Sequence, residues 1–392
     1  MGAAHAHCIA KGEIEGMRLS ALCDIDEGKR LRLAEEFPGV PIFSTHSELI
    51  DSGLVDAIVV ATPHKDHPSV VIDGLNGGLH VLTEKPAAVR AADAEKMAHI
   101  AEKSGKVFAI MFNQRTNPVF KKAREIVKSG ALGQPKRLVW IVTNWYRTQC
   151  YYNSGGWRAT WSGEGGGVLL NQAPHNLDLW QWIFGMPKRI RAFCSVGKWH
   201  NIEVEDDATI YAEYENGAVA TFITSTGEYP GTNRLEISGD LGKLVIEEGH
   251  LKWWKLNEPE RQFCFTSDKG FFKPETEFED IVPEAPETAH RGVLQAFTDA
   301  ILSGGDLVAH GSEGLNELTL SNAAYLSAWT DDWVELPLDH KTFADELDKR
   351  ISSSKPHVGK SEKMSKKYNE RWSVRWGSIR LRSYRSRLQN RR

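Results

Sequence analysis

Lysine and histidine side chains that could transfer a proton stand directly after apolar runs at several places in this sequence. The tripeptide Thr-Pro-His at 62–64 follows the run VDAIVVA, and Glu-Lys-Pro at 84–86 follows the run LHVLT. The segment GGGVLLNQAPHNLD at 165–178 carries another histidine at the start of an expected helix. A lysine or histidine in a cleft can accept or donate a proton when burial moves its pKa toward neutrality. The structural alternatives are an exposed loop charge for Lys85 and a helix cap for His175.

The first residues contain part of a dinucleotide-binding pattern. Such a unit has a strand, a G-x-G-x-x-G turn that admits a pyrophosphate at a helix N-terminus, and an acidic residue about 20 positions on for the ribose. Asp24 lies 22 residues after Gly2, at the end of an apolar segment. Gly2 would be the last glycine of the fingerprint, so the pattern indicates truncation at the N-terminus, a gap in the sheet and weak dinucleotide binding. A helix cap is the alternative role for Asp24.

Histidine spacing also suggests metal binding, which we tested against the usual ligand sets. The pairs at 5–7 and 64–67 have no carboxylate or cysteine cluster to complete them, so we expect no metal. The five cysteines are odd in number and widely spaced, which disfavours a disulfide framework and indicates a reducing cytoplasm.

The composition is that of a globular chain with more than one domain. The chain has 392 residues, of which 41% are hydrophobic and 26% charged. No run approaches the about 20 apolar residues of a membrane span, and no secretion signal is visible. Residues 355–392 hold 13 Lys+Arg and 2 Asp+Glu, whereas the whole chain has a net charge of −4. The acidic body disfavours nucleic acid, and the basic C-terminal segment is typical of a disordered tail.

The elements that must position the polar segments show two patterns. Apolar runs alternate with helical segments over the first ~115 residues, which predicts a parallel sheet. After a helix at 117–129, strand-like runs joined by short turns such as Asn216-Gly217 predict antiparallel pairing. The expected strands are 18–24, 55–61, 79–83, 107–111, 137–145, 189–197, 208–214, 218–225, 234–239 and 243–247.

The predicted fold class is α/β, with a Rossmann-type parallel sheet domain whose first strand is missing and an α+β domain with a mainly antiparallel open sheet. We expect the dinucleotide-binding Rossmann domain at 1–115 and an α/β substrate and oligomerisation domain at 116–285. Helices at 286–345 should pack back on the body, and 346–392 should be the basic tail.

In this order, the polar segments resemble the motifs of the Gfo/Idh/MocA family, the relatives of glucose–fructose oxidoreductase and inositol dehydrogenase. That family carries A-T-P-x-x-x-H, E-K-P and G-G-G-x-L-x-D-x-x-x-H-x-x-D, which residues 61–67, 84–86 and 165–178 match except at position 171. The resemblance covers roughly residues 1–340. It implies hydride transfer between NAD(P) and a sugar or cyclitol.

The resemblance also assigns roles to single residues. Lys85 and His175 would handle the hydroxyl proton, and Asp178 would orient the His175 ring from the same helical face. Asn171 stands where the family often has aspartate, and because an amide takes no proton it could only position substrate or His175. The catalytic candidates are therefore Lys85, His175 and Asn171. The expected cofactor-binding residues are Gly2, Asp24, Thr62, Pro63, His64, His67, Glu84, Lys85 and Gln114. The expected substrate-binding residues are Lys85, Trp157, Arg158, Asn171 and His175, with core packing or a subunit interface as the alternative for the aromatic residues.

The predicted activity is that of an NAD(P)-dependent dehydrogenase acting on a secondary alcohol. Asp24 favours NAD over NADP because its charge would repel a 2′-phosphate, although Lys29 and Arg30 follow closely. The alternatives are an NAD-dependent glycoside hydrolase, acting by transient oxidation and elimination, and a non-catalytic or truncated sugar-binding relative. We expect a cytoplasmic homodimer or homotetramer without nucleic-acid or membrane partners.

Overall fold

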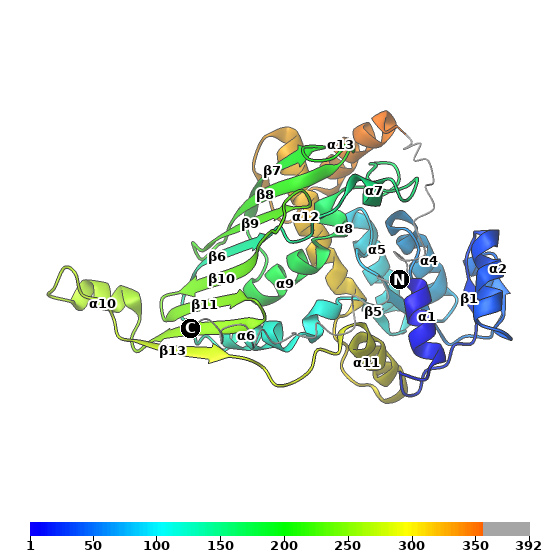
Figure 1. The fold of residues 1–392 in the computed structure, drawn as a ribbon, viewed down its shortest axis with the longest axis horizontal. Helices are drawn as coiled ribbons and strands as arrows, with labels where there is room; N and C mark the ends of the chain where they lie inside the picture. The colour runs from blue at the N-terminus through cyan, green and yellow to red at the C-terminus, as the bar shows by residue number, and fades with distance from the viewer. Residues whose placement is uncertain (356–392) are drawn as a thin grey trace, which may run out of the picture.

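The computed structural model describes residues 1–355 and contains three sheets. Figure 1 shows a long sheet on one side, flanked by helices, and a smaller unit of short strands and helices on the other. The N-terminal residues form the smaller unit and most of the long sheet comes from the middle of the chain, as the two sequence patterns predict.

The N-terminal unit is built on parallel strands. β1 pairs with β2, and β4 lies between β3 and β5 in a separate parallel sheet. Within residues 1–355, β1 and β3 do not pair with each other. The strands of this unit are β1 (Leu22–Cys23), β2 (Ile42–Phe43), β3 (Ala57–Val60), β4 (His80–Thr83) and β5 (Phe108–Ile110). The helices are α1 (Gly2–Ala10), α2 (Glu27–Glu36), α3 (His46–Asp51), η1 (His64–Asp66), α4 (His67–Asn76), α5 (Ala91–Ser104) and η2 (Asn113–Thr116).

The strand that carries the candidate lysine is anchored by burial. Val81 and Leu82 of β4 have no exposed surface, because the two faces of the sheet are covered by different hydrophobic clusters. After β4, helix α5 ends at Gly105, whose φ of +64° requires a residue that tolerates the left-handed region. The carboxyl ends of the three parallel strands therefore open at one edge, where ligands bind in sheets of this kind.

The second unit is a nine-stranded sheet in the order β13-β12-β11-β10-β6-β9-β8-β7-β14. All neighbours are antiparallel except β6 and β9, and the Asn216-Gly217 turn joins β8 to β9 as predicted. The strands are β6 (Pro135–Val142), β7 (Arg189–Val196), β8 (Glu205–Glu213), β9 (Val219–Ser225), β10 (Asn233–Gly239), β11 (Gly242–Glu247), β12 (His250–Leu256), β13 (Thr276–Ile281) and β14 (Val334–Glu335).

Helices cover one face of this sheet (Figure 1). Trp180 of α9 stacks on Phe222 of β9, and α12 packs along β7. The other face is open and carries exposed aromatic side chains such as Phe193. The helices of this part are α6 (Pro118–Lys128), α7 (Gln149–Tyr152), α8 (Val168–Asn171), α9 (Pro174–Phe184), α10 (Glu260–Thr266), α11 (Ala289–Ser303), η3 (Gly311–Glu313), α12 (Gly314–Thr330) and α13 (His340–Ser353).

One boundary and the number of strands differ from the sequence expectations. The expected tail start at 346 falls inside α13, which runs to Ser353 and in which Leu347 is fully buried. The part of the expected tail beyond 355 lies outside the described residues. The sheet also gains β12, β13 and β14, which short or charged sequences concealed. Helix α11 packs with Leu82 of the parallel sheet, so it returns to the N-terminal unit as expected.

Candidate active site

Lys85 lies where the two units meet. It follows β4, and the Lys85–Pro86 peptide is cis. Its Nζ donates a hydrogen bond of 2.8 Å to the backbone carbonyl of Asn171, the last residue of α8. The structure therefore joins two segments 86 residues apart that the sequence analysis assigned to one site.

The Lys85 ammonium is buried among several charges. Burial lowers its pKa, and the carboxylates of Glu84, Glu317 and Glu164 oppose this effect without cancelling it. Glu317, on α12, is fully buried, and neither of its carboxylate oxygens has a hydrogen-bond partner among residues 1–355. A lysine with a lowered pKa, close to polar groups of a second domain, is suited to exchange a proton with a substrate hydroxyl.

His175 lies on α9, one residue after its first position. Its side chain is 9% exposed and its ring meets Phe112 edge-on at 6.5 Å. Burial, and then the charge of Lys85, hold the pKa of His175 well below its ordinary value of 6.5, so the ring is neutral at neutral pH. Its Nδ1 atom is buried and has no hydrogen-bond partner in the described part of the chain. A neutral imidazole next to a lysine is a competent proton acceptor.

Asn171 is held by a carboxylate that the sequence analysis missed. Its Nδ2 atom contacts Glu164 Oε1, and the other oxygen of Glu164 accepts a 2.7 Å hydrogen bond from the Ala159 amide. Glu164 is 2% exposed, and burial raises its pKa. The side chain of Asn171 is therefore tied to the 153–166 segment, while its backbone carbonyl holds Lys85.

Asp178 does not orient His175. Its two carboxylate oxygens accept hydrogen bonds from Arg115 Nε at 2.9 Å and Arg115 Nη2 at 2.6 Å. Both side chains are 1% exposed, and Arg115 also pairs with Glu313 of η3. The expected His175–Asp178 contact is wrong because the buried guanidinium of Arg115 offers a planar bidentate partner and saturates the carboxylate. The pair instead connects η2 of the first unit to α9 of the second.

Glu84, one of the expected cofactor-binding residues, is bound to a histidine of the N-terminal helix. Its Oε1 lies 2.7 Å from His5 Nε2 on α1, and both side chains are buried. Burial raises the pKa of Glu84, but the hydrogen bond and charge of His5, together with His290 and Lys85, lower it to about 2. The carboxylate is therefore ionised, and it anchors α1 to the end of β4.

The segment after β3 divides into exposed and supporting residues. Thr62 is exposed, whereas His64 is 8% exposed and its ring lies edge-on to Trp157 at 5.7 Å. Both ring nitrogens of His67 lie 2.8 Å from backbone carbonyls, those of Pro86 and Thr62. The His67 side chain therefore holds two loops together rather than offering a nitrogen to a cofactor. Pro63 lies between Thr62 and His64 in the chain and is half-buried.

The remaining predicted cofactor residues lie at the edge of the N-terminal unit. Gly2 starts α1, and a Cβ atom there would lie 3.4 Å from Ala61 Cβ, at the end of β3. Asp24 follows β1, and its carboxylate forms an ion pair with Lys29, whose Nζ lies 3.4 Å away. Gln114 is half-buried in η2, next to Asn113, whose amide oxygen and nitrogen are buried and lack hydrogen-bond partners within residues 1–355.

Trp157 and Arg158, from the second unit, pack against each other and against Tyr151. The Arg158 guanidinium lies 4.6 Å from the Trp157 ring centroid and 4.8 Å from that of Tyr151. Arg158 Nη1 also donates to the Tyr151 hydroxyl at 3.0 Å. Trp157 reaches His64, so the two expected substrate residues belong to the same site as the segment after β3.

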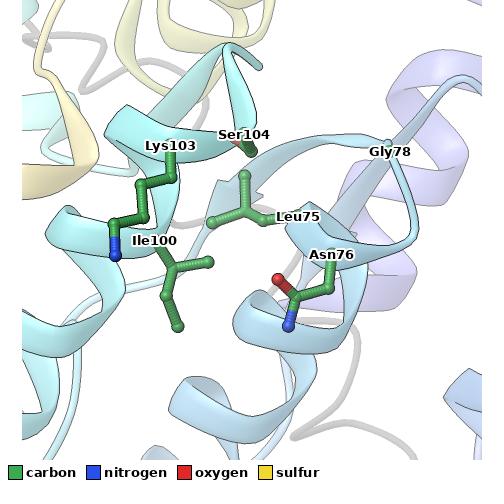
Figure 2. A pocket seen from close by; sticks show the side chains of 6 residues that line it. All are labelled: Leu75, Asn76, Gly78, Ile100, Lys103 and Ser104. Carbon is green, nitrogen blue, oxygen red and sulfur yellow. The ribbon is translucent and has the colours of Figure 1, made fainter.

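One surface pocket lies away from Lys85. Figure 2 shows a pocket of about 290 Å³ between the C-terminal ends of α4 and α5. Its lining residues are Leu75, Asn76, Gly78, Ile100, Lys103 and Ser104. Because the chain enters β4 from this end, the pocket is at the opposite edge of the sheet from Lys85. A second pocket, of about 280 Å³, contains Arg147 and His200.

Two further properties bear on the site. Among residues 1–355, no group of three or more His, Cys, Asp or Glu side chains is arranged to hold a metal ion. No helix in the same range is both long and apolar enough to cross a membrane.

The residues that the sequence did not reveal are mostly those that hydrogen-bond to the predicted site residues or place a charge near them. His5 was considered only for metal binding, and Glu164, Arg115 and Glu317 carry no spacing signal that links them to Lys85. Glu164 directly precedes the three glycines of the 165–178 segment, which is the one local hint of its position.

Comparisons with known proteins agree with this arrangement. Residues 1–112 match the GFO_IDH_MocA profile, described as an oxidoreductase family with an NAD-binding Rossmann fold, and residues 120–245 match the GFO/IDH/MocA C-terminal domain. The chain is 24% identical to D-glucoside 3-dehydrogenase of Escherichia coli over 82% of its own length and 90% of that protein. It is 30% identical to the rhizopine catabolism protein MocA of Rhizobium meliloti over 47% of its own length, a match that spans 54% of that relative.

A solved structure shares the fold. The WlbA dehydrogenase of Bordetella pertussis, in complex with NADH and UDP-GlcNAcA, superposes with a TM-score of 0.72 at 26% identity. The match covers 86% of this chain and 96% of that one.

Proposed function

The chain belongs to the GFO/IDH/MocA family of NAD-binding oxidoreductases, and from this premise we propose that it transfers a hydride between NAD and a secondary alcohol of a sugar or cyclitol. One observation carries the proposal. Lys85 and His175 come from different units, burial lowers the pKa of each, and the charge of Lys85 lowers that of His175 further. Oxidation of an alcohol requires such a pair, because the hydroxyl proton must leave as the hydride does.

The residues on the nicotinamide side fit the cofactor. The Asn113 amide, whose oxygen and nitrogen lack partners among the described residues, can form paired hydrogen bonds to a carboxamide. Thr62 and His64 flank the same edge, and Gly2 begins α1, whose N-terminal amides could face a phosphate. Asp24 would bind the adenosine ribose and favour NAD over NADP. These residues would hold NAD, which would supply the acceptor for the hydride of the carbinol carbon.

The protein's own groups would manage the proton. The neutral His175 ring accepts the hydroxyl proton, and the Lys85 ammonium, fixed by the Asn171 carbonyl, donates a hydrogen bond to the same oxygen. As the oxygen becomes more negative this hydrogen bond strengthens, which lowers the barrier. In the reverse direction, the protonated His175 ring returns the proton to the oxygen while Lys85 keeps its hydrogen bond to that atom.

The substrate class is supported by the side chains of the 151–158 segment. Stacked Trp157 and Arg158 offer an apolar face and hydrogen-bond donors, which suit a polyol ring. The E. coli relative is a glucoside dehydrogenase by name, and the WlbA structure contains a nucleotide-linked sugar acid. Both are consistent with a sugar or cyclitol as substrate here.

We also propose that the protein is a cytoplasmic homodimer or homotetramer. Strand β7 of the long sheet exposes Phe193 by 59% and Val196 by 52%, which a second copy would cover. The five cysteines are all free thiols, as expected in a reducing compartment. Size-exclusion chromatography with light scattering measures the oligomeric state, and a monomer would contradict this part of the proposal.

The activity is tested by a dehydrogenase assay after a binding measurement. NADH is titrated against the purified chain while energy transfer from tryptophan to nicotinamide is recorded, with NAD and NADP as competitors. Polyols, sugars and glucosides are then screened for NADH formation at 340 nm. Saturable binding and turnover support the proposal. Aglycone release without net NADH would identify the glycoside hydrolase alternative, and turnover unaffected in Lys85→Met would refute the proposed role of Lys85.

A further inference from the structure

Glu164 occupies a central place between Lys85 and the substrate segment. Its side chain is 3% exposed, and its Oε1 contacts Asn171 Nδ2 and lies 3.9 Å from Arg158 Nη1. Its Oε2 accepts the Ala159 amide at 2.7 Å. Ala159 has a φ of +57°, a left-handed conformation that residues other than glycine rarely adopt, so this hydrogen bond helps to hold an unfavourable turn.

A continuous series of hydrogen bonds passes through this carboxylate. Lys85 Nζ donates to the Asn171 carbonyl, the Asn171 amide donates to Glu164, and the Ala159 amide donates to Glu164 from the other side. Trp157 and Arg158 directly precede Ala159. The series therefore connects the lysine of one unit with the stacked aromatic and arginine side chains of the other.

We propose that Glu164 is a positioning residue of the dehydrogenase site, and that it supplies next to Lys85 the negative charge that the neutral side chain of Asn171 does not carry. This inference rests on the proposed function. The positioning role of Glu164 follows from its hydrogen bonds. Its role as a negative charge follows from the pairing of a buried carboxylate with the neutral amide of Asn171. The positive charges that face Glu164 itself are Arg158 and Lys85.

The charge on Glu164 is one of several that act on Lys85. The groups that influence Lys85, or that Lys85 influences, come from seven segments: Glu84, Glu317, Glu164, Arg147, His64, His175 and His290. Glu84 is engaged by His5, and Glu317 lies on α12, on a different element from Asn171. Glu164 alone among the three carboxylates contacts the residue that binds the lysine Nζ.

The pairing can be tested by exchanging the carboxylate and the amide. In Glu164→Gln the amide oxygen can still accept from Ala159, and the amide group of Asn171 can flip to accept from the new Nε2, so the geometry is kept and the charge is lost. In Asn171→Asp two buried carboxylates face each other and one must take up a proton. The double variant Glu164→Gln/Asn171→Asp restores one carboxylate and one amide in exchanged positions.

The first measurement reads Lys85 without requiring turnover. Competitive acylation followed by mass spectrometry gives the pH at which Lys85 becomes reactive, in the full chain. We expect Glu164→Gln to lower this midpoint by about one pH unit, because an opposite charge that favoured the ammonium is lost. Glu203→Gln is the matched control, since Glu203 binds the Trp161 amide of the same segment from outside the Asn171 contact. Its midpoint should equal that of the wild type.

The second measurement is the pH profile of kcat/KM for the substrate found in the screen. We expect Glu164→Gln to lower the pKa of the limb assigned to Lys85 by about one pH unit, as in the acylation experiment. Asn171→Asp should lose about tenfold or more in kcat/KM. The double variant should recover most of that loss. NADH binding should be unchanged in all three variants. An unchanged Lys85 midpoint in Glu164→Gln, or a double variant no better than Asn171→Asp, would overturn the inference.

These outcomes are separable from failure of the proposed function. A wild type that binds NADH but oxidises no polyol refutes the proposed function, while the acylation midpoint still decides whether Glu164 sets the charge next to Lys85. If the wild type turns over and the midpoint does not move, the function stands and the role of Glu164 is refuted.

Discussion

The buried pair between Arg115 and Asp178 offers a prediction whose magnitude follows from the structure. Two hydrogen bonds, of 2.9 and 2.6 Å, join side chains that are each 1% exposed. Removing one partner of such a pair costs about 3–5 kcal/mol, because the other charge stays buried without compensation. Arg115 keeps its contact with Glu313, which is 32% exposed, so we expect Asp178→Asn to lose about 3 kcal/mol, the lower end of that range.

The assay is urea unfolding followed by tryptophan fluorescence, with circular dichroism as a second probe to detect intermediates. The companion variant Arg115→Met/Asp178→Leu replaces both charges with apolar side chains of similar size and should be more stable than Asp178→Asn. The reasoning would be refuted if Asp178→Asn lost less than about 1 kcal/mol, or if the double variant were the less stable of the two. A loss that small would mean that water, or a rearrangement of nearby side chains, compensates the buried charge of Arg115.

Three further predictions concern contacts around the site. The Glu84 carboxyl has a folded-state pKa of about 2 against an ordinary value of 4.5, so its stabilising contribution is present above about pH 4.5 and is lost as pH falls through 2. In urea titrations across this range, wild type should therefore lose up to about 3 kcal/mol relative to Glu84→Gln. A Cβ atom at Gly167 would lie 1.9 Å from the Glu205 carbonyl oxygen, so Gly167→Ala should lower the melting temperature and disturb Asn171, as calorimetry and the dehydrogenase assay can show. Tyr325 donates a 2.7 Å hydrogen bond to buried Glu205, and Tyr325→Phe should cost about 1–3 kcal/mol in the same urea experiment; an unchanged midpoint would contradict it.

Local sequence patterns were sufficient for much of the fold. The apolar run 55–61 and the run before Glu84 lie in β3 and β4, and the Asn-Gly pair at 216–217 forms the hairpin that it predicts. Sequence patterns did not predict strands that form only because a neighbouring strand pairs with them. β14 has two residues and pairs with β7, and β13 is a mostly exposed edge strand that pairs only with β12 among the described residues. Neither has a periodicity that a single sequence would reveal.

The sequence was sufficient to predict which residues form the candidate site, but not which contacts hold them there. Lys85, Asn171 and His175 could be placed together through motif resemblance, and the structure brings the first two into contact. The partner of Asp178 could not be predicted, because a helical-face argument considers only neighbours along α9 and Arg115 reaches it from η2. The same holds for His5 and Glu84, which are 79 residues apart.

The central claim is that Lys85 and His175 together handle the hydroxyl proton in a hydride transfer. The most direct measurement compares NADH affinity and the pH profile of kcat/KM in wild type, Lys85→Met and His175→Asn, with Lys103→Met, at the remote pocket, as a matched lysine control. The account predicts unchanged NADH affinity, a loss of about 10²–10⁴ in kcat/KM for the first two variants and none for the third. Full activity in either Lys85→Met or His175→Asn, with NADH bound as in the wild type, would contradict it.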